Sequence, residues 1–136
     1  MADSFAIVDA GTRAISGAQM GSVFARSGIR RPGEDLARLE KMIQHANLLA
    51  GAWEGDLLVG VVRGMTDFSY CCYVSDLAVD RAYQRRGIGK ALINYVRGRL
   101  SDEVGIVLIA APEANEYYGH LGFERIENGW RIPRRR

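Results

Sequence analysis

The sequence has 136 residues, a length that predicts one domain spanning residues 1–136. Its 18 Lys and Arg residues oppose 16 Asp and Glu residues, and three of the positive charges are the last three residues, Arg134–Arg136, so the rest of the chain is near neutral and no nucleic-acid-binding surface is expected. The hydrophobic share of 48% and the charged share of 25% are typical of a globular protein and exclude wholesale disorder.

The first third of the chain predicts one short strand and two helices. The apolar run Phe5–Val8 predicts the strand. Ser16 followed by Gln19 is a capping-box pattern, and the apolar residues after it recur at helical spacing. Gly28–Gly33 contains two arginines and a proline, which favours a loop. A second amphipathic helix follows, with apolar residues three and four positions apart: Leu36, Leu39, Met42, Ile43 and Ala46.

The middle of the chain has the pattern of paired strands and one helix. The apolar runs Leu48–Trp53 and Leu57–Val62 flank a short polar segment, which predicts a hairpin. A second turn is expected at Gly64–Phe68, before a long strand at Tyr70–Val79. The next helix is expected at Gly87–Leu100, because its apolar residues form one stripe: Ile88, Ala91, Leu92, Tyr95 and Val96.

The last third of the chain predicts a buried strand, a short helix and a closing hairpin. Gly105–Ala110 is continuously apolar, as in strands buried on both faces, and should lie parallel to the strand before the helix. Pro112 suits a helix start and Gly122 a helix end. Two short strands, Phe123–Ile126 and Trp130–Ile132, are expected around Asn128-Gly129. The predicted order is β-α-α-β-β-β-α-β-α-β-β, a mixed α/β sheet.

The cysteines, the histidines and the hydropathy of the chain indicate its location and whether it binds metal or a membrane. Cys71 and Cys72 are adjacent, so a disulfide framework is excluded and a reducing, cytoplasmic location is expected. His45 and His120 have no cysteine companions at metal-ligand spacing, so no metal is expected. No apolar run approaches the ~20 residues of a membrane span, and the N-terminus does not resemble a signal peptide, so no membrane association is expected.

The segment from Asp76 to Leu92 contains the clearest chemical pattern. It passes from a strand through a basic connector into a helix that opens with Gly87 and Gly89. Free backbone N–H groups at a helix start bind anions, and glycines allow a phosphate to approach the backbone closely. A pyrophosphate-bearing ligand would suit this site, whose basic residues are Arg85, Arg86 and Lys90.

Two known phosphate motifs do not fit this segment. A Rossmann fingerprint needs glycine at position 92, where the chain has Leu92. A Walker loop needs glycine at position 84 and Ser or Thr at position 91, where the chain has Gln84 and Ala91. The glycines could also serve only to shape a turn beside a solvated basic face.

The motif Gln84-Arg85-Arg86-Gly87-Ile88-Gly89 resembles the Q/R-x-x-G-x-G/A signature of the GCN5-related N-acetyltransferases (GNATs). Leu77-Ala78-Val79 is similar to the apolar strand that precedes this signature, and Glu116–Phe123 resembles the family's F-Y-x-x-L-G-F segment. The predicted order of elements is also that of the family. Two shorter strings, Arg63–Asp67 and Ser75–Asp80, are similar to a subgroup that includes the plastid and cyanobacterial serotonin/lysine N-acetyltransferases.

The resemblance implies a cleft for acetyl-CoA between splayed central parallel strands. The strand residues would pair with the pantetheine arm, and the following loop and helix start would hold the pyrophosphate. Asn115 would cap its helix or contact the CoA. The residues so implied are Leu77, Ala78, Val79, Gln84, Arg85, Arg86, Gly87, Ile88, Gly89, Lys90, Ala91 and Asn115.

The resemblance also suggests catalytic roles. Tyr118 matches the tyrosine near the CoA sulfur, where a protonated phenol would donate a hydrogen bond, and with it a proton, to the leaving thiolate. Asp76 is the first candidate for the general base, with a structural salt bridge to an arginine as its alternative role. Many members have a glutamate where this chain has Tyr73. Asp67 is the second candidate and would bind the cationic substrate.

The expected function is therefore transfer of acetyl from acetyl-CoA to a primary amine, either a small amine or a lysine side chain, by direct attack in a ternary complex. The loops around Ser27–Gly33 and Thr66–Ser69 should shape the acceptor pocket, and a homodimer could complete it because the closing hairpin is short. Two alternatives keep the fold without the chemistry: a non-catalytic acyl-CoA-binding sensor, and an interaction module using the Arg131–Arg136 tail.

Overall fold

A computed structural model of the chain describes residues 4–136. Five strands form one sheet in the order β1-β2-β3-β4-β5, and every neighbouring pair is antiparallel except β4 and β5. The mixed α/β class predicted from the sequence is confirmed. The elements in chain order are β1 (Ala6–Asp9), α1 (Gly17–Ser27), α2 (Leu36–Gln44), β2 (Leu48–Glu54), β3 (Leu57–Thr66), β4 (Cys71–Val79), η1 (Arg81–Tyr83), α3 (Ile88–Arg99), β5 (Gly105–Leu108), η2 (Pro112–Ala114) and η3 (Tyr118–Leu121).

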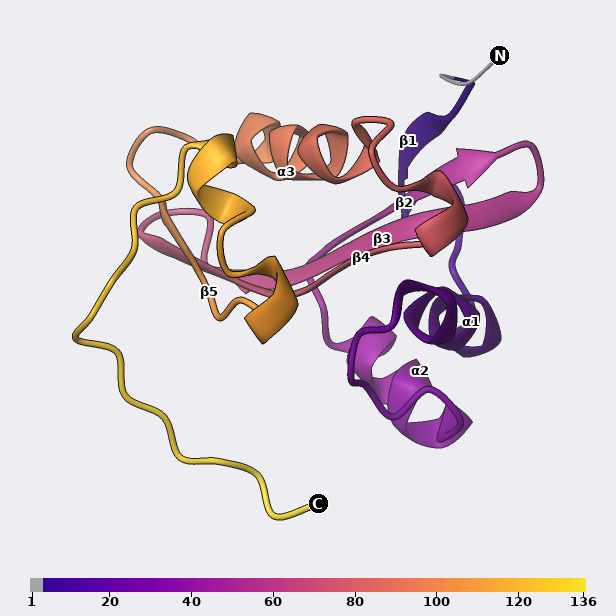
Figure 1. Ribbon diagram of the computed structural model, residues 1–136, viewed down its shortest axis with the longest axis horizontal. Helices are drawn as coiled ribbons and strands as arrows, with labels where there is room; N and C mark the ends of the chain where they lie inside the picture. Colours follow the sequence, from indigo (N-terminus) through magenta and orange to yellow (C-terminus); the bar gives the residue numbers. More distant parts are fainter. Residues whose placement is uncertain (1–3) are drawn as a thin grey trace.

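The helices cover the two faces of the sheet and divide the core in two. Figure 1 shows α3 over one face and the pair α1 and α2 against the other. Met20, Phe24 and Leu39 are buried in the core on the α1 and α2 side. Ile88 and Leu92 belong to the second core, on the α3 side. Among residues 4–136, no helix is long and apolar enough to cross a membrane.

The capping box predicted for α1 is present. The Ser16 hydroxyl accepts the N–H of Gln19 at 3.0 Å, and the Gln19 side-chain oxygen accepts the N–H of Ser16 at 2.9 Å. At the other end, Gly28 adopts a left-handed conformation with φ of 84°, in which its N–H bonds the Phe24 carbonyl. Local sequence signals therefore set both ends of this helix.

The central strand β4 contains a bulge that the sequence did not predict. Arg63 of β3 faces Asp76, whereas the next residue, Gly64, faces Val74, so Ser75 is the extra residue. Because a bulge shifts the alternation of side chains by one position, Val74 packs on the α3 side while Asp76 and the residues after it reverse their faces. The bulge thereby turns Asp76 toward α1 and α2.

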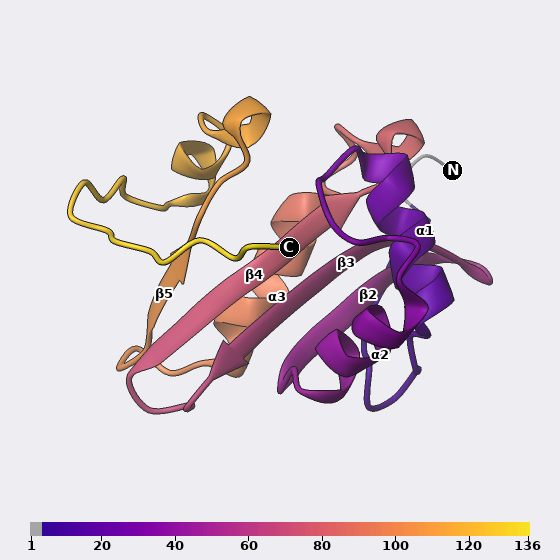
Figure 2. The same ribbon diagram turned by 90° about the horizontal axis from the view of Figure 1, so that it is seen from below.

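The predicted parallel pairing of β4 with β5 is confirmed and the two strands splay, but β5 is the edge strand of the sheet and not a central one. Cys71–Val74 of β4 pairs with Gly105–Leu108 of β5, and among the described residues the remaining half of β4, Ser75–Val79, has no strand partner on that side. Figure 2 shows the two strands separating like the arms of a V, with η2 and η3 beyond the end of β5. The edge of this segment that faces away from β3 has no strand partner, although side chains already bond the carbonyls at its two ends: Arg31 bonds that of Ser75 and Gln84 that of Val79.

Two predictions for the C-terminal part were wrong. The single helix expected between Pro112 and Gly122 is two short 3₁₀ helices, η2 and η3, although Gly122 ends the second with a φ of 92° as expected. The closing hairpin does not form. Neither Asn128 nor Gly129 has the positive φ that a two-residue hairpin turn of this type needs. Because an isolated hairpin of such short strands is marginal, its Trp130 stays 98% exposed.

One predicted turn was also misplaced. The strand β3 continues through Gly64 to Thr66, so the turn expected at Gly64–Phe68 falls later, at residues 67–70. The Thr66 side chain and the Asn47 side chain both bond backbone groups at this end of the strand, which extends the ladder.

Candidate active site

The start of α3 presents unpaired backbone donors in a basic surrounding. Gly87 precedes the helix in a left-handed conformation, with φ of 83°, and no side chain caps the helix. Arg85 also has a positive φ, 67°, which is uncommon for a residue with a side chain. The first N–H groups of α3 have no acceptor within the helix, and no side chain caps them. Such a geometry binds phosphate oxygens.

Side chains attach this loop firmly to the end of β4. Asp80 accepts the N–H of Ala82 at 2.9 Å and a guanidinium N–H of Arg26 at 2.5 Å. Gln84 donates from its side-chain amide to the carbonyl of Val79 at 3.0 Å. The Tyr83 hydroxyl donates to Glu54 at 2.6 Å. The anion site and the free edge of β4 are therefore held in one rigid arrangement.

Tyr118 lies in an aromatic cluster beyond the splay. Its ring makes edge contacts with the rings of Tyr117 and Phe123, at centroid distances of 5.3 and 5.6 Å. Burial raises the pKa of Tyr118 to about 12, the neighbouring Tyr117 acts in the same direction, and the positive charge of Arg31 opposes the rise. Tyr118 therefore keeps its proton at neutral pH, so its hydroxyl is able to donate a hydrogen bond.

Tyr117 connects this cluster to the anion site. A side chain built at Gly89 would place its Cβ only 2.3 Å from the Tyr117 hydroxyl oxygen, so the phenol lies directly on the first turn of α3. The sequence predicts only a packing role for Tyr117, since nothing local connects it with a residue 28 positions earlier. The lack of a side chain at Gly89 is thus needed for the packing of Tyr117.

Asp76 has the arginine partners of its alternative, structural role. Its side chain is 0% exposed, and its two carboxylate oxygens accept from Arg31 Nε at 2.5 Å and from Arg63 Nε. The same two arginines also bond the Ser75 carbonyl and hydroxyl. Both oxygens of this buried carboxylate are occupied by guanidinium donors, which favours the structural role over the general-base role predicted for it.

The structure does not bring Asp67 to the cleft. Asp67 lies in the turn between β3 and β4, separated from Val79 by the whole length of β4, roughly 26 Å at the usual rise per strand residue. One of its oxygens accepts the N–H groups of Tyr70, Ser69 and Cys71, which lower the pKa of Asp67 to about 2. Its observed role is to stabilise the turn. Asn115, the last of the predicted contacts, is exposed at the end of η2.

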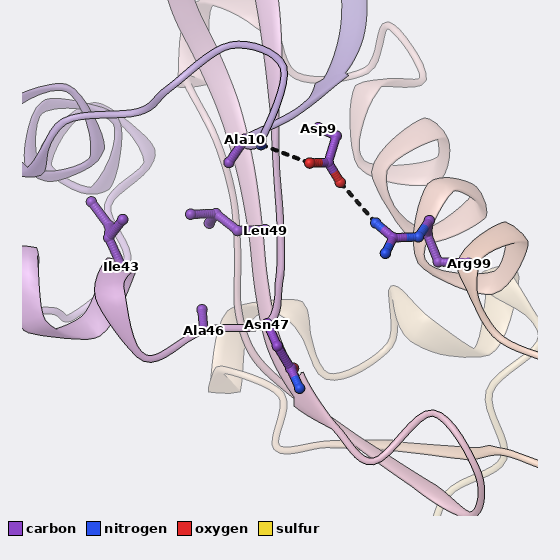
Figure 3. A pocket seen from close by; sticks show the side chains of 8 residues that line it. Asp9, Ala10, Ile43, Ala46, Asn47, Leu49 and Arg99 are labelled. Carbon is purple, nitrogen blue, oxygen red and sulfur yellow. Dashed lines mark hydrogen bonds and ion pairs between the residues drawn. The ribbon is translucent and has the colours of Figure 1, made fainter.

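A separate pocket of about 350 Å³ lies at the far end of the sheet. Figure 3 shows apolar residues of α2 and β2 on one side and Asp9 with Arg99 on the other. The polar side chains of the pocket already have hydrogen-bond partners: Arg99 donates to Asp9 at 2.7 Å, and the Asn47 side chain bonds the Thr66 backbone. The described residues contain no cluster of three or more His, Cys, Asp or Glu that could hold a metal.

Comparison with known proteins connects this geometry to a family. Residues 22–131 match the model described as an acetyltransferase (GNAT) domain. The chain belongs to the GNAT acetyltransferase family. The resemblance read from the Gln84–Gly89 motif is thereby confirmed.

Relatives that are similar in sequence to this GNAT domain are also named acetyltransferases. The histone acetyltransferase TAP1 of Glycine max is 38% identical over 74 residues, which are 53% of this chain and 32% of the relative. An uncharacterized ycf52-like N-acetyltransferase of Prochlorococcus marinus is 31% identical over 100 residues, 69% of this chain and 54% of the relative. The chain thus spans about a third to a half of the length of these relatives.

Solved structures show the same fold. A GNAT-family acetyltransferase of Streptococcus pneumoniae superposes with a TM-score of 0.75 at 22% identity, covering 97% of this chain and 99% of that one. An aminoglycoside N-acetyltransferase in complex with CoA superposes with a TM-score of 0.67 at 15% identity, covering 96% and 95%.

Proposed function

We propose that the protein transfers acetyl from acetyl-CoA to a primary amine in a ternary complex. The observation that carries the proposal is the splay at Ser75–Val79, which continues directly into the uncapped start of α3. An extended pantetheine arm would pair with the free strand edge, and the pyrophosphate would accept from the N–H groups of Arg85–Lys90. The thioester would then lie where β4 and β5 separate, toward Tyr118.

In the transfer step, the free amine attacks the thioester carbonyl, the C–S bond breaks and CoA leaves as a thiolate. A thiol ionises near ~8.5, whereas the pKa of Tyr118 is about 12. Full proton transfer from the phenol to the sulfur is therefore uphill. Tyr118 would stabilise the departing thiolate by donating a hydrogen bond, and the proton that the thiol finally takes would come from the acylated nitrogen.

Water would then take the proton from the ammonium group of the acceptor. Asp76 is neutralised by two arginines, and Asp67 lies at the opposite end of β4. Because an alkylammonium has a pKa near ~10, its free-amine fraction rises about tenfold per pH unit below that value. The rate with a simple alkylamine should rise accordingly, with no plateau near neutral pH of the kind that a protein carboxylate would produce.

The test combines acetyl-CoA binding with CoA release in the presence of an amine panel. Titration calorimetry should show acetyl-CoA binding, and thiol detection should show amine-dependent release. Tyr118→Phe should lower kcat by roughly 10–10³-fold with little change in the acetyl-CoA Kd, because one donor to the leaving group is lost. Tyr70→Phe is the matched control, since this phenol is 79% exposed at the opposite end of β4. An unchanged kcat in Tyr118→Phe, with chemistry rate-limiting, would assign the role to another group.

One observation favours the alternative of a non-catalytic acyl-CoA-binding protein. Neither predicted carboxylate, Asp76 or Asp67, is placed to take a proton from an acceptor. Acetyl-CoA binding without thiol release, across the whole amine panel and up to pH 9, would select this alternative.

A further inference from the structure

The loop between α1 and α2 places one arginine on the face of β4. The loop is packed tightly on α1, because a Cβ at Gly21 would lie 2.5 Å from the carbonyl oxygen of Gly33. The N–H of Gly33 turns back to bond the Arg31 carbonyl at 2.8 Å. From this held backbone, the Arg31 side chain reaches Asp76 and the Ser75 carbonyl, 45 and 44 positions away in sequence.

The charges at this point do not balance. One carboxylate, Asp76, faces two guanidinium groups, those of Arg31 and Arg63, and the other acceptors are the uncharged oxygens of Ser75. The trio therefore has a net charge of +1. The Arg63 side chain is 10% exposed and that of Arg31 is 27% exposed, so the uncompensated charge is accessible at Arg31.

Arg31 is also the charged group that acts on Tyr118. Its positive charge opposes the burial that raises the pKa of this phenol. Three of its five N–H groups donate within the described residues, to Asp76, to the Ser75 carbonyl and to the Arg30 carbonyl at 2.6 Å. The remaining donors and the excess charge lie at Ser75 and Asp76, directly after the last paired residues of β4 and β5, where the proposed function places the thioester.

We propose that the acceptor is an amine that also carries an anionic group, a carboxylate or a phosphate, and that this group binds Arg31. The proposal rests on acetyl transfer at Tyr118. A guanidinium binds either anion through two parallel N–H bonds, whereas an acceptor with only positive charges meets a like charge at the same point. The specificity then resides in a residue of the α1–α2 loop, outside the acetyl-CoA site.

The experiment compares acceptors that differ only by the anionic group: lysine with 1,5-diaminopentane, tyrosine with tyramine, and phosphoethanolamine with ethanolamine. We expect kcat/KM to be about 10–100-fold higher for the anionic member of at least one pair, in line with one charge-assisted contact. The carboxylate and phosphate pairs distinguish the two anions. Arg31→Gln should remove the preference.

Arg13→Gln is the matched control, because Arg13 also makes an ion pair, with Asp56 at 3.5 Å, has a comparable side-chain exposure of 38% and lies outside the contacts that hold the acetyl-CoA loop. It should keep the preference. Hexanoate, a carboxylate without an amine, tests the same point on the unaltered protein and should compete with the preferred amino acid but not with acetyl-CoA.

Equal or better turnover of the cationic member in every pair overturns the inference and leaves acetyl transfer intact. A preference that survives in Arg31→Gln overturns it as well. Loss of acetyl-CoA binding, or no CoA release with any amine, overturns the proposed function itself, and the inference with it.

Discussion

The two roles considered for Asp76 predict opposite results for Asp76→Asn. In the structure this carboxylate is 0% exposed and pairs with Arg31 and Arg63. Asparagine is nearly isosteric but leaves both guanidinium groups without a counter-charge. Removing one partner of a buried ion pair costs about 3–5 kcal/mol, which for a chain of this size lowers the melting temperature by roughly 10–20 °C. Urea and thermal unfolding of purified protein measure both quantities.

A surface pair provides the control. Asp56 pairs with Arg13 at 3.5 Å and is fully exposed, so Asp56→Asn should change the free energy of unfolding by no more than about 0.5 kcal/mol. A general base would behave differently from a structural ion pair. The structural role would be refuted by a variant whose free energy of unfolding lies within about 1 kcal/mol of that of the unaltered protein, but which loses activity at pH 7 and regains it at pH 9.

Three further predictions concern the anion site, the β3–β4 turn and a helix cap. Lys90→Glu, on the exposed first turn of α3, should weaken acetyl-CoA binding about tenfold or more in calorimetry, because the new negative charge repels phosphate. It should not lower stability, because a negative charge suits a helix start. Lys41→Glu on α2 is the control and should leave the affinity unchanged. Asp67→Ala should lower the melting temperature at pH 7. Since the folded pKa of Asp67 is lowered to about 2 from an ordinary value near ~3.9, the stabilisation is present above pH 4 and disappears as the pH falls to 2, so the two proteins should converge in thermal scans there. Ser16→Ala should cost about 1 kcal/mol in urea unfolding, through loss of the capping box, and an unchanged midpoint would contradict the capping role.

Much of the fold follows from signals that are local in the sequence. Ser16 and Gln19 make a capping box by themselves, and Gly28 ends the same helix, because each interaction joins residues within one or two turns. The apolar stripe of α3 and the continuous apolar run of β5 indicate their elements for the same reason. The anion site proposed at Arg85–Lys90 is also local, since its N–H groups and its glycines belong to one segment.

The sequence predicted more regular secondary structure in the C-terminal region than the fold contains. Asn128-Gly129 is a strong hairpin signal, but a turn forms a stable hairpin only when its strands have a surface to pack on. Trp130 and Ile132 are almost fully exposed, so no such packing supports the pair. Whether a local turn preference is expressed depends on tertiary burial.

The catalytic assignment depended on contacts that no local pattern specifies. From its position before the motif, Asp76 could be a base or a salt-bridge partner, and only the fold shows the two arginines that it pairs with. The bulge at Ser75 turns Asp76 toward α1 and α2, where Arg31 reaches it from 45 positions away. Tyr117 similarly meets Gly89 across the cleft. Short-range patterns determined the elements and the segment proposed to bind phosphate, whereas the ion pairs of Asp76 arise from side chains that meet only once the sheet and its loops are assembled.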